Sequence, residues 1–327
     1  MRAKKKWIWA VFAAVVLAVL LGLTACGGPA EQKSSETGQK TEKAASTAPK
    51  KDEAASKKTR KPQQKAEKAP RQKETQRISW NPNWEFAGYA RIHRDSVVLY
   101  RSSHTPRKNI TVAVNAGHGT SGHEDVYTLC HPDGSPKLVS GSTRAGETKA
   151  AAAAQGTTMA DGTSEADVNL SAARILKKVL LRHGYDVLMI RTDRDAQLDT
   201  VARTVFANEN ADCHLALHYD STRSDKGMFF LSVPDNHSYR SMEPVSVHWR
   251  QHMALGKAII AAARSSEANV FGDGMMDNDL TQTSYSTVPS VDLEIGDEVT
   301  DHSAAAQKKT AQIILRGLNQ YFRENGK

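Results

Sequence analysis

The chain has 327 residues and a formal net charge of +8, but the charge is unevenly distributed. Residues 1–77 hold 18 Lys/Arg and 7 Asp/Glu, whereas the remainder holds 26 and 29. The remainder of the chain therefore lacks the excess of positive charge that nucleic-acid binding requires, and an enzyme that acts on nucleic acids is disfavoured. Three cysteines in this length also exclude a disulfide scaffold.

The first 26 residues have the pattern of an export signal. Four basic residues within positions 2–6 precede a 17-residue apolar run at 7–23, which is at the lower limit for spanning a bilayer. The run ends in Leu-Thr-Ala-Cys, which resembles the bacterial lipobox and implies cleavage before Cys26 and lipidation of its sulfur. Two acyl chains anchor a protein stably. An uncleaved single-span anchor is the alternative, and both place the rest of the chain at the extracytoplasmic face of a bacterial membrane.

Residues 27–79 are a predicted linker. From 27 to 77 the sequence is mainly Ala, Lys, Glu, Ser, Thr, Gln and Pro, with no large apolar residue until Ile78. Such a segment cannot bury enough apolar surface to offset its chain entropy, so we expect a disordered tether. The next segment, 80–109, is interpreted as a lead-in, in which residues 97–100 could form an edge strand.

From residue 110 onward, strand and helix patterns alternate. Strands are predicted at 110–116, 185–191, 212–219, 227–233 and 290–295, and helices at 164–183, 198–208, 245–264 and 303–322. Ser164 is a candidate N-cap of the first helix, and Gly184 is a candidate stop. The alternation predicts an α/β domain at 110–325, with a single mostly parallel twisted sheet and helices on both faces. Ligands of such sheets bind beyond the carboxyl ends of the strands.

Four side chains suited to chemistry fall at that edge. His118 lies in the turn after the first strand, His218 and Glu294 end two later strands, and Glu165 begins the first long helix. Two imidazoles and one carboxylate are a common set of catalytic zinc ligands, and a further carboxylate can act as general base and acid. Singly, His118 could be only a turn residue, Glu165 a helix-start acid and His218 a core histidine. A carboxylate such as Glu294 is costly in a buried strand unless it is paired or used.

Taken together, these motifs resemble a known family. The order is A-G-H-G, a Glu opening a helix as E-A-D-V-N-L, then A-D-C-H-L-A-L-H and V-D-L-E-I-G. This is similar to the zinc-dependent N-acetylmuramoyl-L-alanine amidases of the amidase_3 type, over residues 110–319. The resemblance implies a cell-wall hydrolase that cleaves the amide between N-acetylmuramic acid and L-alanine of peptidoglycan, with Zn²⁺ as cofactor.

Residue by residue, the resemblance implies zinc ligation by His118, Glu165 and His218 and general base and acid catalysis by Glu294. The expected partners are peptidoglycan and, through Cys26, a membrane, while an unknown protein activator is left open. Two alternatives also stay open. One is a non-catalytic peptidoglycan-binding or regulatory module on the same fold, and the other is a zinc peptidase acting within the stem peptide.

The sequence departs from the family pattern at several positions. Asn115 stands where the family usually has Asp, and Asp220 stands in place of the Asn of an H-x-N motif. After the catalytic Glu, Asp297 and Glu298 add two acids where the family has an aromatic residue nearby. Arg203 matches a family arginine that we interpret as structural. These changes bear on substrate detail rather than on the metal ligands.

The largest departure is an insertion at about 120–160, which separates His118 from Glu165 by 47 positions. A long loop at the edge of an active site is usually functional or disordered. We interpret it as a mobile flap that gates the substrate, with an ornamental insert as the alternative. Side chains in it that could substitute as ligands are His123, Glu124, His131 and Glu147. Cys130 and Cys213 could pair in an oxidising compartment, but the sequence cannot place their Cα atoms.

Overall fold

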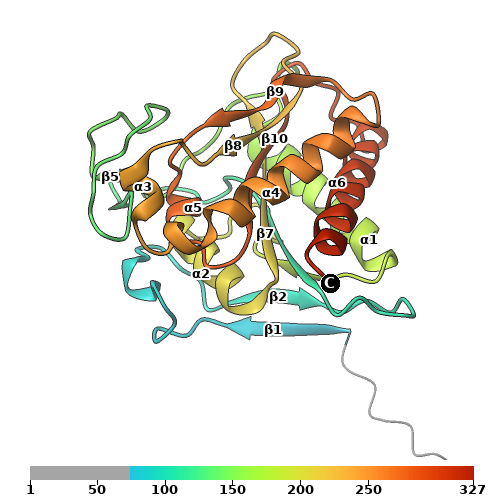
Figure 1. Cartoon of the computed structure of the whole chain (residues 1–327), viewed down its shortest axis with the longest axis horizontal. Coiled ribbons are helices and arrows are strands. Elements are labelled where there is room, and N and C mark those ends of the chain that lie inside the picture. Colours follow the sequence, from blue (N-terminus) through green and yellow to red (C-terminus); the bar gives the residue numbers. More distant parts are fainter. Residues whose placement is uncertain (1–73) are drawn as a thin grey trace, which may run out of the picture. The chain divides into compact units, whose positions relative to one another are not determined.

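The computed structural model describes residues 74–327, which form a central eight-stranded sheet surrounded by helices (Figure 1). The strand order is β1-β2-β6-β3-β7-β10-β8-β9. The strands are β1 (Thr75–Ser79), β2 (Ser96–Tyr100), β3 (Thr111–Ala116), β6 (Asp186–Met189), β7 (Cys213–Asp220), β8 (Met228–Ser232), β9 (Val270–Asp277) and β10 (Ser290–Asp297). Parallel pairing joins β6, β3, β7 and β10 in the middle, and also β8 to β9. The predicted α/β fold with a mostly parallel sheet is confirmed.

Two layers of helices bury the sheet. The helices are α1 (Glu165–Arg182), α2 (Thr200–Asn210), α3 (His237–Ser241), α4 (Val245–Arg264), α5 (Thr281–Tyr285) and α6 (Ala304–Glu324), with a short 3₁₀ helix at Ala87–Tyr89. Residues of α1, α4 and α6 form the larger apolar core with one face of the sheet, and α2 packs on the other face. Since both faces are covered, β3 is almost continuously buried, as parallel strands of this kind usually are.

Local signals placed the helix ends well. The Ser164 hydroxyl accepts the N–H of Asp167 at 3.2 Å and caps α1, and Gly184 follows the helix with a φ of 88°. Ser303 caps α6 in the same way. These side chains satisfy backbone groups that a helix terminus leaves without partners.

The N-terminal boundary of the fold lies earlier than predicted. The linker expected at 27–79 ends sooner, because Thr75–Ser79 forms β1 and pairs antiparallel with β2. The predicted strand at 97–100 is part of β2, which is second from the edge rather than at it. The predicted signal segment, most of the linker and Cys26 lie outside the described residues. Within 74–327, no helix is both long and apolar enough to cross a membrane.

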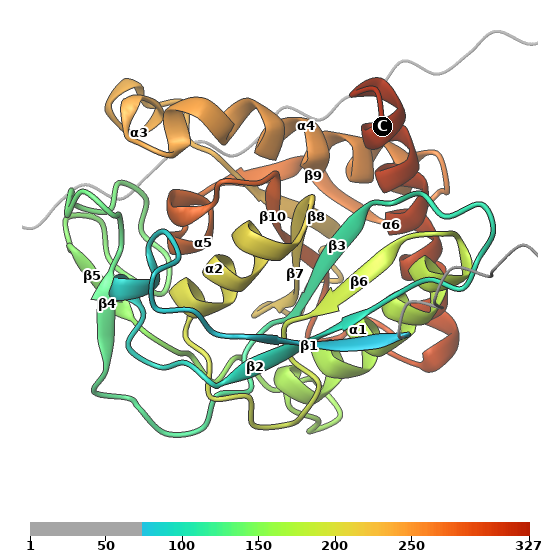
Figure 2. The same ribbon diagram turned by 90° about the horizontal axis from the view of Figure 1, so that it is seen from below.

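The insertion, here residues 121–158, lies beside α5 and α2 at one end of the sheet (Figure 2). Its regular structure is one antiparallel pair, β4 (Tyr127–Leu129) with β5 (Lys149–Ala151). Cys130 in the insertion and Cys213 in β7 are both buried, free thiols, so the disulfide considered from the sequence is not formed.

Candidate active site

The turn that carries His118 is held by two buried arginines. His118 adopts a left-handed conformation with a φ of 61°. Arg191 donates to the carbonyl of Gly117 at 3.0 Å and Arg203 to that of His118 at 2.7 Å, and both also donate to Ala116. Burial lowers the pKa of Arg191 to about 10 and that of Arg203 to about 9, which leaves both charged at neutral pH. These contacts agree with the structural role expected for Arg203, while the sequence analysis did not single out Arg191.

The structure brings together the three candidate ligands His118, Glu165 and His218. Nε2 of His118 lies 3.1 Å from Nδ1 of His218 and 3.1 Å from Oε2 of Glu165. Nδ1 of His218 lies 3.1 Å from Oε1 of Glu165. Among residues 74–327, these three are the group of His, Cys, Asp and Glu whose donor atoms could hold a metal ion. The substitute ligands considered in the insertion do not belong to it.

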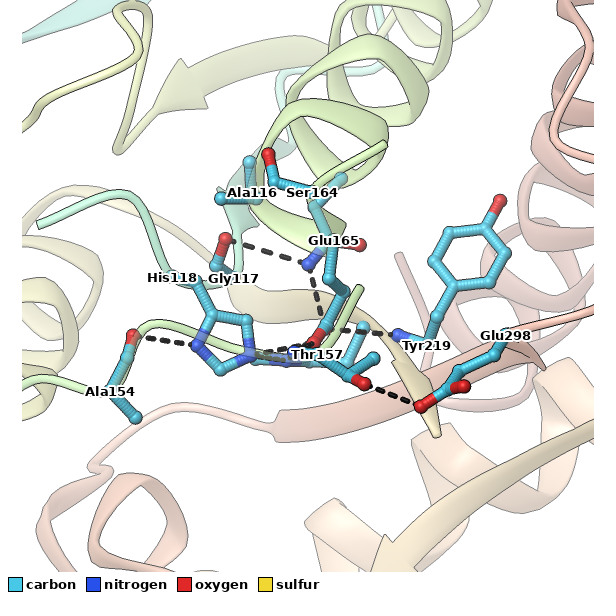
Figure 3. Close-up of polar contacts among 12 residues, drawn as sticks. Ala116, Gly117, His118, Ala154, Thr157, Ser164, Glu165, Tyr219 and Glu298 are labelled. Carbon is cyan, nitrogen blue, oxygen red and sulfur yellow. Dashed lines mark hydrogen bonds and ion pairs between the residues drawn. The ribbon is translucent and has the colours of Figure 1, made fainter. Parts of the chain in front are cut away.

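Glu165 is buried and held by three N–H donors. They are the Asn169 side chain at 3.0 Å, the backbone of Thr157 at 2.9 Å and the backbone of Tyr219 at 3.2 Å. Figure 3 shows the contact between Glu165 and Tyr219. Burial acts to raise the pKa of Glu165, but the two histidines in contact with it outweigh burial and lower its pKa far below the usual value. The side chain is therefore an anion. Asn169 was missed by the sequence analysis, although its i+4 spacing from Glu165 places both on one side of α1.

The end of the insertion touches the ligands directly. Nδ1 of His118 lies 2.8 Å from the carbonyl of Ala154 (Figure 3). Because a carbonyl only accepts, Nδ1 carries a proton, and in the neutral imidazole the lone pair of Nε2 then points toward the other two candidate ligands. Gly156 has a φ of 83°, and a Cβ there would lie 2.6 Å from Cδ2 of His118 and 2.7 Å from Oε2 of Glu165. The backbone at 154–157 thus forms the second layer around the ligands.

On the opposite side, a glycine of the turn lets the second histidine approach. A Cβ on Gly117 would lie 2.2 Å from Cε1 of His218. No side chain could occupy that space, so the turn must carry glycine for the two imidazoles to come together. The A-G-H-G motif therefore has a packing reason as well as a conformational one.

Two carboxylates of β10 face the same site. Glu294 pairs with His218 in the parallel register of β10 and β7, which puts the two side chains on one face. Burial raises the pKa of Glu294 well above its usual value and also raises that of Asp292. Oδ2 of Asp292 lies 3.8 Å from Nε2 of His218. Asp292 was not among the site residues expected from the sequence, although the alternation Asp-Leu-Glu along the strand indicates that it shares the face of Glu294.

A groove of about 470 Å³ opens over the histidines. His118, His218 and Asp292 contribute to its lining, and residues 149–154 of the insertion form one wall. Residues 280–282, at the start of α5, contribute to the lining as well. A substrate that reaches the two imidazoles therefore contacts the insertion.

A buried polar cluster around Asp279 holds another part of the insertion, residues 131–139. Nζ of Lys137 lies 3.2 Å from Oδ1 of Asp279, and Nε2 of His131 lies 3.1 Å from Oδ2 of the same residue. Asp279 also accepts the backbone N–H groups of Leu138 and Val139. All three side chains are less than a tenth exposed. These contacts tie residues 131–139 of the insertion to Asp279, and the mobile flap expected from the sequence stays a prediction.

The residues that depart from the family pattern hold neighbouring loops. Asn115 accepts from Arg203 at 2.8 Å. Glu298 accepts from the Thr157 hydroxyl at 2.5 Å, which ties the end of the insertion to the segment after β10 (Figure 3). Asp297 is fully buried and accepts backbone N–H groups at residues 224 and 226. The added acids therefore have structural partners.

The carboxyl edge of the sheet presents two imidazoles, a carboxylate anion and two further buried carboxyl groups. This set of side chains is typical of hydrolytic enzymes. The chain belongs to the N-acetylmuramoyl-L-alanine amidase family, whose profile matches residues 112–323. This confirms the family indicated by the sequence motifs and, with it, hydrolysis of the bond between N-acetylmuramic acid and L-alanine in peptidoglycan.

Solved structures agree with the fold. The apo form of the N-acetylmuramyl-L-alanine amidase Ami1 from Mycobacterium abscessus is 17% identical, with a TM-score of 0.53, over 65% of this chain and 99% of that one. Ami1 from Mycobacterium smegmatis is also 17% identical, with a TM-score of 0.53, over 66% and 98%. At this identity the likeness concerns the fold alone. No protein of curated function matches the chain.

Proposed function

We propose that this amidase works with Zn²⁺ held by Nε2 of His118, the carboxylate of Glu165 and Nδ1 of His218. The observation that carries the proposal is the convergence of these groups at mutual distances of 3.1 Å. Nδ1 of His118 is occupied by the carbonyl of Ala154, so Nε2 of the neutral ring is an acceptor and faces the carboxylate of Glu165, which also only accepts. Two acceptors at this distance need a proton or a metal ion between them. Two nitrogens and one carboxylate suit zinc and leave a position open for catalysis.

Glu294 is the proposed general base and acid. Zinc bound at such a site lowers the pKa of a water toward about 7 and polarises a carbonyl. Oε2 of Glu294 is buried and has no hydrogen-bond partner within 74–327, so it is free to take a proton. It would accept this proton from the attacking water and pass it to the departing nitrogen of L-alanine. The products are a free lactyl carboxylate and a peptide that begins with L-alanine.

The Glu294→Gln variant tests this assignment. We expect kcat to fall about 10²–10⁴-fold, because the amide cannot exchange the proton, while the zinc content stays unchanged. Glu209→Gln, an exposed position at the end of α2, is the matched control and should keep full activity. Turnover would be followed on muropeptides, with the fragments identified by mass spectrometry. Near wild-type turnover by Glu294→Gln would contradict the role, and cleavage within the stem peptide would favour a peptidase.

We also propose that the protein is a lipoprotein, anchored through Cys26 at the extracytoplasmic face of the membrane. The lipobox-like sequence and the apolar run before it support this proposal. Cys26→Ser should abolish labelling by palmitate. Thr24→Ser, which keeps the lipobox pattern, should leave the labelling unchanged. Equal labelling of the two variants would contradict the anchor.

A further inference from the structure

Asp292 is a buried carboxylate that the proposed reaction does not use. It lies on β10 opposite Ala216 of β7, two residues before Glu294 and on the same face of the sheet. It is 9% exposed, and its Oδ1 has no hydrogen-bond partner within the described part of the chain. Burying an anion without a compensating partner is costly. Its place in the groove lining, beside both histidines, therefore calls for a role.

The geometry of His218 supplies that role. Its Nδ1 faces His118 and Glu165 at 3.1 Å, so Nδ1 is the atom offered to a metal. A neutral imidazole that gives one nitrogen to a metal carries its proton on the other. That other nitrogen, Nε2, lies 3.8 Å from Oδ2 of Asp292. A donor that must be protonated thus faces Oδ2 of a carboxyl group whose other oxygen, Oδ1, has no hydrogen-bond partner within the described residues.

We propose that Asp292 is a positioning residue for His218. It accepts the Nε2–H, which fixes the tautomer and the ring orientation with Nδ1 toward the metal ligands. The present separation is an ion-pair distance, and a shift of about 1 Å brings it to hydrogen-bond length. Acceptors of this kind also raise the basicity of a ligating histidine. This inference rests on the proposed zinc site.

The two histidines are then supported differently. His118 donates to the carbonyl of Ala154 in the insertion, whereas His218 faces a carboxyl group on the sheet itself. Glu294, next to His218 in the register, is left free to exchange protons. Asp292 therefore orients a metal ligand, whereas Glu294 exchanges protons with the substrate.

Zinc affinity of the full-length protein, measured by competition with a chelator, tests the proposal. Asp292→Leu should weaken zinc binding about 10–100-fold. Asp292→Asn, which keeps the shape and one acceptor oxygen, should lose less. Glu147→Gln is the matched control, because Glu147 also lines the groove but is exposed and does not belong to the group of three candidate ligands. The free energy of unfolding of each metal-free variant shows whether it remains folded.

The outcomes distinguish a failure of the role of Asp292 from a failure of the proposed zinc site. Affinity that falls in the order wild type, Asp292→Asn, Asp292→Leu supports the positioning role. Wild-type zinc affinity in both folded variants overturns the role of Asp292 and leaves the zinc site intact. A wild-type protein that binds no zinc contradicts the proposed function itself, and the inference with it. If Asp292→Leu fails to fold, the isosteric Asp292→Asn decides alone.

Discussion

The carboxyl edge of the sheet and the insertion at 121–158 both contact the ligands, but they are held in place differently. At the sheet edge, the parallel register of β3, β7 and β10 sets where His118, His218 and Glu294 lie. Many backbone hydrogen bonds share that task. The insertion has one short pair of strands and depends on a few buried contacts around Asp279. Single side-chain changes should therefore displace the insertion more readily than the sheet edge.

Among the changes that test this comparison, Lys137→Met is expected to have the largest effect. The substitution leaves Asp279 buried without its cation, which should lower the free energy of unfolding by about 3 kcal/mol. Because Lys137 also lines the groove, the affinity for peptidoglycan should fall as well. Urea unfolding and the KM for cell walls measure the two effects.

An exposed lysine of the same insertion provides the control. Lys149→Met should change the free energy of unfolding by no more than about 0.5 kcal/mol. If Lys137→Met is equally mild, the buried cluster does not anchor the insertion, and the contrast with the sheet edge fails.

Gly156→Ala tests whether the end of the insertion presses on the ligands. A Cβ there would meet both His118 and Glu165, so we expect zinc affinity or activity to fall about 10–100-fold. Gly134→Ala is the matched control, since Gly134 also has a positive φ, 76°, but has nothing within 4 Å of an added Cβ. Both variants carry backbone strain. Equal losses in the two would show that strain, rather than contact with the ligands, causes the effect.

Acid should weaken the contacts of Asp279 with the insertion, and the effect should be smaller than that of Lys137→Met. Burial acts to raise the pKa of Asp279, but hydrogen bonds from His131 and from the backbone lower it to about 2. The unfolded-state pKa is about 3.9. The contribution of Asp279 is therefore complete above about pH 4 and is lost as the pH falls toward 2, at a cost of about 2 kcal/mol.

Urea unfolding between pH 2 and 6 measures that loss. Asp279→Asn should flatten this part of the stability profile, because its amide does not titrate. The exposed Asp133 in the same insertion provides a control, and Asp133→Asn should leave the profile as it is in the wild type. An unchanged acid slope in Asp279→Asn would assign the pH dependence to other carboxyl groups.

Prediction from sequence succeeded where the signal is local. The helix expected at 245–264 is α4 with the same bounds, because its apolar residues recur at helical spacing. It failed for β1, which has one apolar residue in Thr75–Ser79 and forms by pairing with β2. It also failed to find β9 (Val270–Asp277), whose glycines and exposed residues give no strand pattern.

The candidate site shows the same division. Motif order pointed to His118, Glu165, His218 and Glu294, and the structure brings the first three within hydrogen-bond distance and places Glu294 beside His218. The contacts of Gly156 with the ligands had no local signal, because they depend on where a long insertion returns to the sheet.

By itself, the sequence determined the α/β class, the helix ends and the family, because periodicity, capping residues and motif order are properties of neighbouring positions. Only the tertiary structure decided that the insertion lines the groove and contacts Asp279, that Cys130 and Cys213 are free, and that Asp292 faces His218. Those facts depend on distances between segments far apart in the chain, which packing and strand register set and no local pattern encodes.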